Sequence, residues 1–203
     1  METTIRVNNL YVSYDGNRIL TDAQFEMPTG RLVGIIGANG SGKSTLMKGM
    51  LGLIPVDRGE VTIEGKTVKE QLKNIAYVPQ RATIDWDFPI TVLDTVLLGT
   101  YPSLGLFRRP KKQHREWAQQ CLEKVGMGEY AERQIGELSG GQQQRVFLAR
   151  ALAQKADFLF LDTSLFIKKH ASSSYSRVFP SLKSSSEGLL LFFQAEDGIR
   201  DNT

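Results

Sequence analysis

The nine residues Gly37-Ala38-Asn39-Gly40-Ser41-Gly42-Lys43-Ser44-Thr45 constrain the fold of this chain more than any other stretch. They follow an apolar run, 32–36, that is typical of a buried strand, and they open a helix-prone run, 45–53. Glycine adopts backbone angles that other residues avoid, so the three glycines favour a tight loop between the two elements. The order strand, glycine-rich loop, helix predicts an α/β fold.

This loop has the spacing of a phosphate-binding P-loop. Its glycines let backbone N–H groups approach a phosphate, and the helix behind it directs its partly positive N-terminus at the same anion. Lys43 adds a charge for the β- and γ-phosphates, and the Ser44 hydroxyl is a possible Mg²⁺ ligand. A glycine-rich turn with a chance lysine is the alternative, which the flanking strand and helix disfavour. We expect nucleotide contacts from Gly37, Asn39, Gly40, Ser41, Gly42, Lys43, Ser44 and Thr45.

The composition is that of a globular domain. The 203 residues are 41% hydrophobic and 23% charged, and the formal net charge of +3 gives no support for nucleic-acid binding. Cys121 is the only cysteine, which excludes an internal disulfide, and its apolar helical neighbours predict packing rather than a nucleophile. No apolar run reaches the roughly 18 residues of a membrane span, so we expect any link to a membrane to come through a partner.

The remaining patterns place strands around a block of helices. The runs 5–14 and 19–27, joined by Asp15-Gly16-Asn17, predict an antiparallel hairpin. Further strands are expected at 60–64, 74–79 and 158–162, helices at 91–98, 113–125 and 139–154, and a loop at 101–110. We therefore predict a P-loop core with a mainly parallel sheet, an antiparallel β subdomain and an inserted α-helical subdomain at about residues 81–154.

A second glycine-containing stretch, Leu138-Ser139-Gly140-Gly141-Gln142, opens the last of these helices. This stretch has the features of a second phosphate-binding site. It combines a serine at the N-cap position, two glycines that permit close approach and a helix N-terminus behind them. A plain helix cap with a glycine turn is the alternative. Its position after a P-loop favours the first interpretation.

With these motifs in this order, the chain resembles the nucleotide-binding subunits of ABC transporters from about Ile5 to Asp162. Residues 37–45 match the Walker A loop of that family, and 158–162 match the Walker B strand, whose acid holds Mg²⁺ through water. Gln80 matches the Q-loop glutamine, which touches Mg²⁺ and the attacking water and senses the membrane partner. The resemblance implies ATP and Mg²⁺ as cofactors. It implies Lys43, Gln80 and Asp162 as catalytic residues and Ser44, Gln80 and Asp162 as metal ligands.

The resemblance also implies a dimer. Ser139, Gly140, Gly141 and Gln142 match the family signature, which contacts ATP held by the opposite subunit of a head-to-tail homodimer. Tyr14 is similar to the aromatic residue that stacks on adenine, although a strand aromatic in the core is the alternative. Arg145 either supports the signature loop or lies on the surface. His114 and His170 form no ligand cluster, so we interpret both as ordinary polar residues.

Residues 82–92 resemble the manganese and zinc (metal-chelate) uptake branch of the family. In ABC subunits this region faces the coupling helix of the integral-membrane permease, although Trp86 and Phe88 could instead belong to the core of the helical block. The resemblance implies a permease partner, an indirect link to a metal-binding extracytoplasmic protein, and a location at the cytoplasmic face of the cell membrane. The subunit itself would not bind the transported metal, and no nucleic acid is expected as a partner.

The resemblance stops after Asp162. Thr163 stands where the family has a water-polarising glutamate, and no histidine follows a strand as the family's switch histidine does. Residues 163–203 are serine-rich, and 189–201 resemble a translated sequencing adapter. We expect a truncated ABC domain at 1–162, followed by a non-family tail that is disordered or artefactual; genuine divergence is the alternative. The C-terminal part of the core would then be missing. The run 189–193 is apolar enough to fill its place in the sheet, but nothing specifies its register.

The sequence therefore favours an ATP-binding and ATP-hydrolysing subunit that powers an ABC importer of Mn²⁺ or Zn²⁺, with hydrolysis impaired in this chain. A soluble ABC-type ATPase that acts on ribosomes or DNA is one alternative, although it would usually have two cassettes or a coiled-coil insertion. A truncated product without function is another.

Overall fold

The computed structural model describes residues 4–28, 32–80, 88–104, 108–164 and 190–195. Its strands are β1 (Thr4–Tyr14), β2 (Asn17–Pro28), β3 (Leu32–Ile36), β4 (Arg58–Ile63), β5 (Lys66–Thr67), β6 (Ile75–Val78), β7 (Phe158–Ser164) and β8 (Leu190–Ala195). Its α-helices are α1 (Lys43–Met50), α2 (Val68–Gln71), α3 (Val92–Leu97), α4 (Tyr101–Leu104), α5 (Lys112–Lys124) and α6 (Gly140–Gln154). Single 3₁₀ turns are η1 (Leu72–Asn74), η3 (Leu98–Thr100), η4 (Gly128–Tyr130) and η5 (Ile135–Glu137).

The predicted hairpin forms one edge of an antiparallel sheet with the strand order β2-β1-β4-β5. Asp15 and Gly16 connect β1 to β2, and both have positive φ angles, 49° and 79°. This conformation matches the right-handed twist of the strands, and an Asp-Gly pair adopts it readily. The turn leaves Tyr14 at the end of β1, paired with Asn17.

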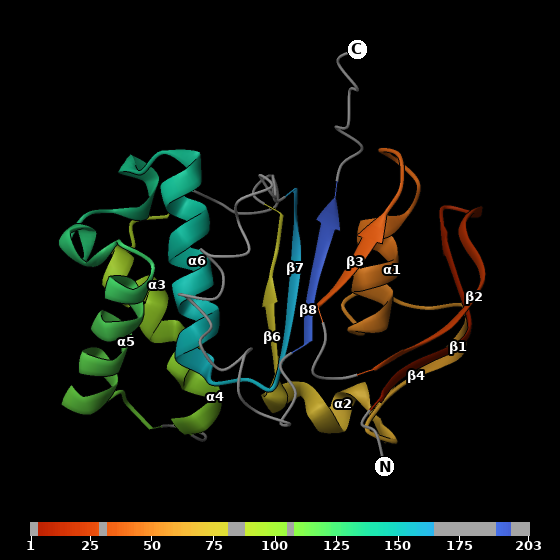
Figure 1. The fold of residues 1–203 in the computed structure, drawn as a ribbon, viewed down its shortest axis with the longest axis horizontal. Coiled ribbons are helices and arrows are strands. Elements are labelled where there is room, and N and C mark those ends of the chain that lie inside the picture. The colour runs from red at the N-terminus through yellow and green to blue at the C-terminus, as the bar shows by residue number, and fades with distance from the viewer. Residues whose placement is uncertain (1–3, 29–31, 81–87, 105–107, 165–189, 196–203) are drawn as a thin grey trace.

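The second sheet is parallel and has the order β3-β8-β7-β6 (Figure 1). β8 lies between β3 and β7 in a register that pairs Val33 with Phe192 and Leu161 with Phe193. A strand of the predicted tail therefore fills the position between β3 and β7, where we expected the truncated core to lack a strand. The rest of the tail, 165–189 and 196–203, lies outside the described residues, so the predicted domain boundary at 162 stays a prediction.

Alternation along β6 and β7 divides the interior into two cores. Ala76, Val78, Leu159 and Leu161 pack with α3, α5 and α6. Their neighbours Ile75, Phe158 and Phe160 instead pack with α1, β1 and β4. Successive side chains of a strand point to opposite faces, so α1 and α6 cover opposite faces of the parallel sheet (Figure 1).

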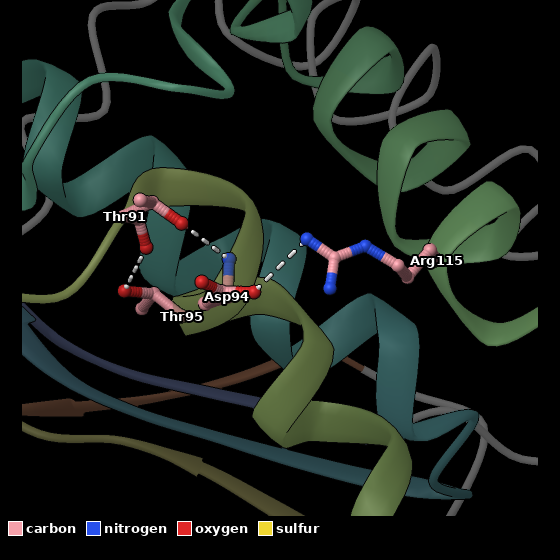
Figure 2. A network of polar contacts seen from close by, with 4 residues as sticks. All are labelled: Thr91, Asp94, Thr95 and Arg115. Carbon is pink, nitrogen blue, oxygen red and sulfur yellow. Dashed lines mark hydrogen bonds and ion pairs between the residues drawn. The ribbon is translucent and has the colours of Figure 1, made fainter. Parts of the chain in front are cut away.

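The helical block begins at Thr91, whose side chain caps α3. Its hydroxyl accepts a hydrogen bond from the Asp94 backbone N–H at 3.1 Å, and its carbonyl accepts one from the Thr95 hydroxyl at 2.8 Å. Arg115 of α5 reaches the Asp94 carboxylate at 3.3 Å, which ties the two helices together (Figure 2). Both side chains of this ion pair are half-exposed, so its contribution to stability is about 0–1 kcal/mol.

The predicted loop at 101–110 is wrong at its start, because residues Tyr101–Leu104 form the short helix α4. This helix continues directly from η3, and the Ser103 hydroxyl donates to the Thr100 carbonyl at 2.7 Å. Pro102 does not prevent the helix, because proline is tolerated in a first turn.

Cys121 lies on α5 in the interior of the helical core, which confirms its predicted packing role. Burial raises the pKa of its thiol to about 11, so little thiolate is present at neutral pH. Within the described part of the chain, no helix combines the length and apolar character that a membrane crossing requires.

Candidate nucleotide site

The P-loop connects β3 to α1, and its last turn requires a glycine. Gly42 is the N-cap of α1 and has a φ angle of 89°, in the left-handed region. A Cβ atom there would also lie 3.1 Å from Leu20 Cδ2, since β2 of the hairpin packs against the loop. Gly42 therefore satisfies both the backbone angle and the close approach of the antiparallel sheet.

The N-terminus of α1 is open to an anion. Within the described residues, no side chain caps this helix and its first turn contains no acidic residue. Asn39, Gly40 and Ser41 of the loop are solvent-exposed. The helix thus presents its partly positive end beside an exposed loop, where a phosphate would find a favourable site.

Lys43 lies under this loop and is only 6% exposed. Its ammonium group donates to the carbonyl oxygens of Gly37 at 2.5 Å and Ala38 at 2.7 Å. These two hydrogen bonds keep the lysine side chain against the loop and hold its charge beside the α1 N-terminus. A phosphate bound there would be an ionic partner for this buried charge.

Asp162, on β7, meets Ser44 of α1 although 118 positions separate the two residues. The Ser44 hydroxyl donates to Asp162 Oδ1 at 2.8 Å. Alternation along β7 explains this contact, because Asp162 follows Phe158 and Phe160 on the face of the sheet that α1 covers. The structure therefore brings together Lys43, Ser44 and Asp162, three of the residues that the sequence assigned to one site.

Tyr77 of β6 is a fourth member of this group, and our sequence analysis missed it. Its hydroxyl donates to Asp162 Oδ2 at 3.0 Å. Burial, and then the Asp162 carboxylate, raise the pKa of Tyr77 well above its usual value, so the phenol keeps its proton. Alternation along β6 places Tyr77 on the strand face that it shares with Ile75, toward α1, but its contact with Asp162 depends on the pairing of β6 with β7.

The Asp162 carboxylate fits a role as a metal ligand. It is 1% exposed, and among the described residues no lysine, arginine or histidine forms an ion pair with it. Among the described residues, the hydrogen bonds that its two oxygens accept come from the neutral hydroxyls of Ser44 and Tyr77. Carboxylate and hydroxyl oxygens suit a hard cation such as Mg²⁺. Asp162 and Ser44 are the residues that would hold it.

Gln80 lies two residues after β6 and is solvent-exposed. Because Val78 pairs with Leu161, Gln80 just after β6 and Asp162 near the carboxyl end of β7 lie at the same end of two neighbouring parallel strands. The two residues thus lie at one edge of the sheet, the edge where α/β folds bind ligands. Strand alternation does not position the Gln80 side chain, since the strand has already ended.

Two of the aromatic residues that the sequence singles out, Tyr14 and Phe88, are exposed. Tyr14 is 43% exposed at the tip of the hairpin, which excludes the alternative of a core aromatic. Phe88 is 60% exposed, so it is not part of the helical core either. Trp86 lies outside the described residues.

The stretch 139–142 lies on the far side of the sheet from α1. Gln142 turns back so that its side-chain oxygen accepts the Ser139 N–H at 2.9 Å, which fixes the start of α6. Ser139 and Gly141 are exposed, and a Cβ atom on Gly141 would meet nothing within 4 Å. Since α1 and α6 pack against opposite faces, this helix start and the helix that follows the P-loop lie on different faces of the sheet.

The neighbouring polar residues have ordinary roles. Arg145 on α6 is solvent-exposed, in agreement with a place on the surface. His114 accepts a hydrogen bond at Nδ1 from the Lys111 backbone N–H at 2.9 Å, so it helps to begin α5. His170 lies outside the described residues.

Comparison with known proteins agrees with this geometry. The family model described as "ABC transporter" matches residues 20–165. The manganese transport system ATP-binding protein MntB of Bacillus subtilis is 54% identical over 158 residues, which are 78% of this chain and 63% of that protein. The zinc transport system ATP-binding protein TroB of Treponema pallidum is 50% identical over 158 residues, which are 78% of this chain and 59% of that protein. The chain spans less than two thirds of the length of these relatives.

Solved structures agree at the level of the fold. A structure described as a metal-chelate type ABC transporter in an inward-facing conformation has a TM-score of 0.74 and 27% identity, and the match covers 95% of this chain and 73% of that chain. An ATP-binding cassette of an ABC transporter in its ADP conformation also has a TM-score of 0.74, at 23% identity, over 97% of this chain and 82% of that one. The predicted fold class is confirmed, and this chain belongs to the ABC transporter family.

Proposed function

We propose that this chain is the ATP-binding subunit that powers an ABC importer of Mn²⁺ or Zn²⁺. The observation that carries the proposal is the Ser44–Asp162 contact at 2.8 Å, beside the buried ammonium of Lys43 and the open N-terminus of α1. Relatives at 50% identity or more are named as ATP-binding proteins of manganese or zinc transport systems, which supports the choice of metal.

Each residue of the site has a separate task. The α1 N-terminus and Lys43 bind the phosphates, and the exposed ring of Tyr14 stacks on the adenine base. Ser44 and Asp162 would hold Mg²⁺, which would supply positive charge to offset that of the phosphates. Gln80 lies at the same sheet edge, where it can contact the attacking water. In such a site, catalysis of phosphoryl transfer rests on positioning and electrostatics.

The signature stretch acts on the ATP of a second copy. In one chain the α6 N-terminus and the P-loop lie on opposite faces of the sheet, so Ser139, Gly140, Gly141 and Gln142 do not reach the nucleotide of their own P-loop. A head-to-tail homodimer would bring each α6 N-terminus to the partner's phosphates. Two ATP molecules would then lie between the two copies.

Replacing Gly141 by alanine tests this arrangement. We expect ATP to induce at least about tenfold less dimer, because a methyl group would occupy the space in which a phosphate approaches the helix N-terminus. The melting temperature should not fall, since that methyl group has open space within the chain. Analytical ultracentrifugation with Mg-ATP measures the dimer, and the exposed residue Gln120, replaced by alanine, is the control. An unchanged ATP-induced dimer would argue against the trans role of the signature.

We also propose that residues 163–203 are not the family's continuation and that this chain hydrolyses ATP slowly. Thr163 has no carboxylate with which to polarise water, and general-base catalysis typically contributes about 10²–10⁴-fold. Enzymes typically turn over at about 1–10³ s⁻¹. The rate of phosphate release at saturating Mg-ATP should therefore be at least about 100-fold lower. The Lys43→Ala variant gives the contaminant background. Turnover of an ordinary ATPase in the unaltered chain would refute this proposal.

A permease is the proposed membrane partner, and the proposed location is the cytoplasmic face of the cell membrane. A metal-binding extracytoplasmic protein would deliver the ion to that permease. Co-purification with a membrane permease would support this assignment, whereas co-sedimentation with ribosomes would support a soluble ABC-type ATPase.

The genomic DNA downstream of the Asp162 codon tests the tail directly. If it encodes Glu-Pro and later a strand followed by a histidine, the tail is an error.

A further inference from the structure

The Tyr77 side chain is placed to orient the Asp162 carboxylate. β6 and β7 are parallel neighbours, and Tyr77 pairs with Phe160, two residues before Asp162. Residues two apart share a face, so Tyr77 and Asp162 are diagonal neighbours on the side that α1 covers. A diagonal neighbour is within reach of an aromatic side chain, and the phenol oxygen lies 3.0 Å from Asp162 Oδ2.

The two carboxylate oxygens have different partners on different elements. Oδ2 accepts from Tyr77 on β6, and Oδ1 accepts from Ser44 on α1. A quarter turn of the carboxylate about its Cβ–Cγ bond would break both hydrogen bonds, and a half turn would only exchange the two equivalent oxygens. The Tyr77 contact therefore keeps Oδ1 directed at Ser44, the second oxygen that a cation would use.

Tyr77 is itself held in place. Its ring packs against the core formed by α1, β1, β4 and the shared face of β6 and β7. Its hydroxyl donates a hydrogen bond to Asp162 Oδ2, so the group acts as a donor to the carboxylate. A rigid, neutral donor fixes the carboxylate without cancelling its negative charge.

We propose that Tyr77 is a positioning residue that sets the Mg²⁺ affinity of the nucleotide site through Asp162. This inference rests on the proposed function, because it concerns the same site. Partners that hold a metal ligand in orientation typically contribute about 10–100-fold to metal affinity. Tyr77 would act at the low end of this range, since Ser44 also orients the carboxylate.

The Tyr77→Phe variant of the full chain removes only the hydroxyl. Binding of a fluorescent ATP analogue is measured in EDTA and then over a range of Mg²⁺ concentrations. We expect the Mg²⁺ concentration that gives half of the Mg²⁺-dependent change in nucleotide binding to rise about tenfold. Nucleotide binding in EDTA should stay at the wild-type level. The matched control is Tyr130→Phe, because Tyr130 is a partly buried tyrosine in the other core and should leave both values unchanged.

A Tyr77→Phe response to Mg²⁺ that equals the wild type would overturn the inference. A loss of nucleotide binding in EDTA as large as the loss with Mg²⁺ would also overturn it, because the hydroxyl would then serve the fold rather than the cation. A wild-type chain whose ATP binding ignores Mg²⁺ would contradict the proposed function itself, and that result appears before any variant is measured.

Discussion

Replacing Lys43 by alanine is expected to abolish tight Mg-ATP binding. Lys43 is buried beside the α1 N-terminus, and its ammonium would pair with phosphate in a desolvated position. Truncating one partner of such a pair costs about 2–5 kcal/mol, which is roughly a 30-fold to several-thousand-fold loss of affinity. Titration with a fluorescent ATP analogue measures this loss.

The control for this variant lies on the same helix. Lys48 is in the last turn of α1, so Lys48→Ala removes an equal charge away from the loop. Its ATP affinity should stay within about threefold of the wild type, because the effect of a charge on the helix terminus falls off within one turn. Equal losses in the two variants would show that net charge, and not the P-loop geometry, determines binding.

Replacing Gly99 by alanine is expected to cause the largest loss of stability. η3 packs against α6 so closely that a Cβ on Gly99 would lie 2.1 Å from the Arg150 carbonyl oxygen and 3.1 Å from Ala153 Cβ. The first of these atoms belongs to a helix backbone and cannot rotate away. η3 must therefore move from α6, at a cost of about 3 kcal/mol in the free energy of unfolding. Urea denaturation measures this cost.

Gly141→Ala is the matched control, because it adds the same methyl group on α6 in open space. Alanine stabilises a helix relative to glycine by about 0.5–1 kcal/mol, so this variant should be as stable as the wild type or slightly more stable. A Gly99→Ala chain with wild-type stability would contradict the described contact between η3 and α6.

The fold could be predicted wherever local pattern and chain order agree. The hairpin was predictable because Asp15-Gly16 suits the positive φ angles of a tight turn, and α6 because a serine and two glycines mark its start. The short helix α4 was not predictable, because Pro102 and the glycines around it are also typical of a loop. The register of β8 was not predictable either, since the apolar run at 190–193 carries no alternation to specify it.

The site was predictable in its parts but not in one of its contacts. Motif spacing placed Lys43 and Ser44 at a helix N-terminus and Asp162 at a strand end, and the structure joins Ser44 to Asp162. Tyr77 escaped prediction because its role depends on the pairing of β6 with β7, which no local pattern encodes. The place of the signature stretch relative to the P-loop likewise depends on which face of the sheet each helix covers.

The central claim is that the P-loop, Ser44 and Asp162 form one site for Mg-ATP, and thermal unfolding tests it most directly. A ligand at 100 times its dissociation constant stabilises a chain by about 2.7 kcal/mol. The full chain should therefore unfold cooperatively, at a midpoint that Mg-ATP raises by several degrees. ATP in EDTA should raise it less. Asp162→Asn should lose the difference between these two conditions. A midpoint that neither ligand changes, or an equal response to Mg-ATP in Asp162→Asn, would contradict the claim.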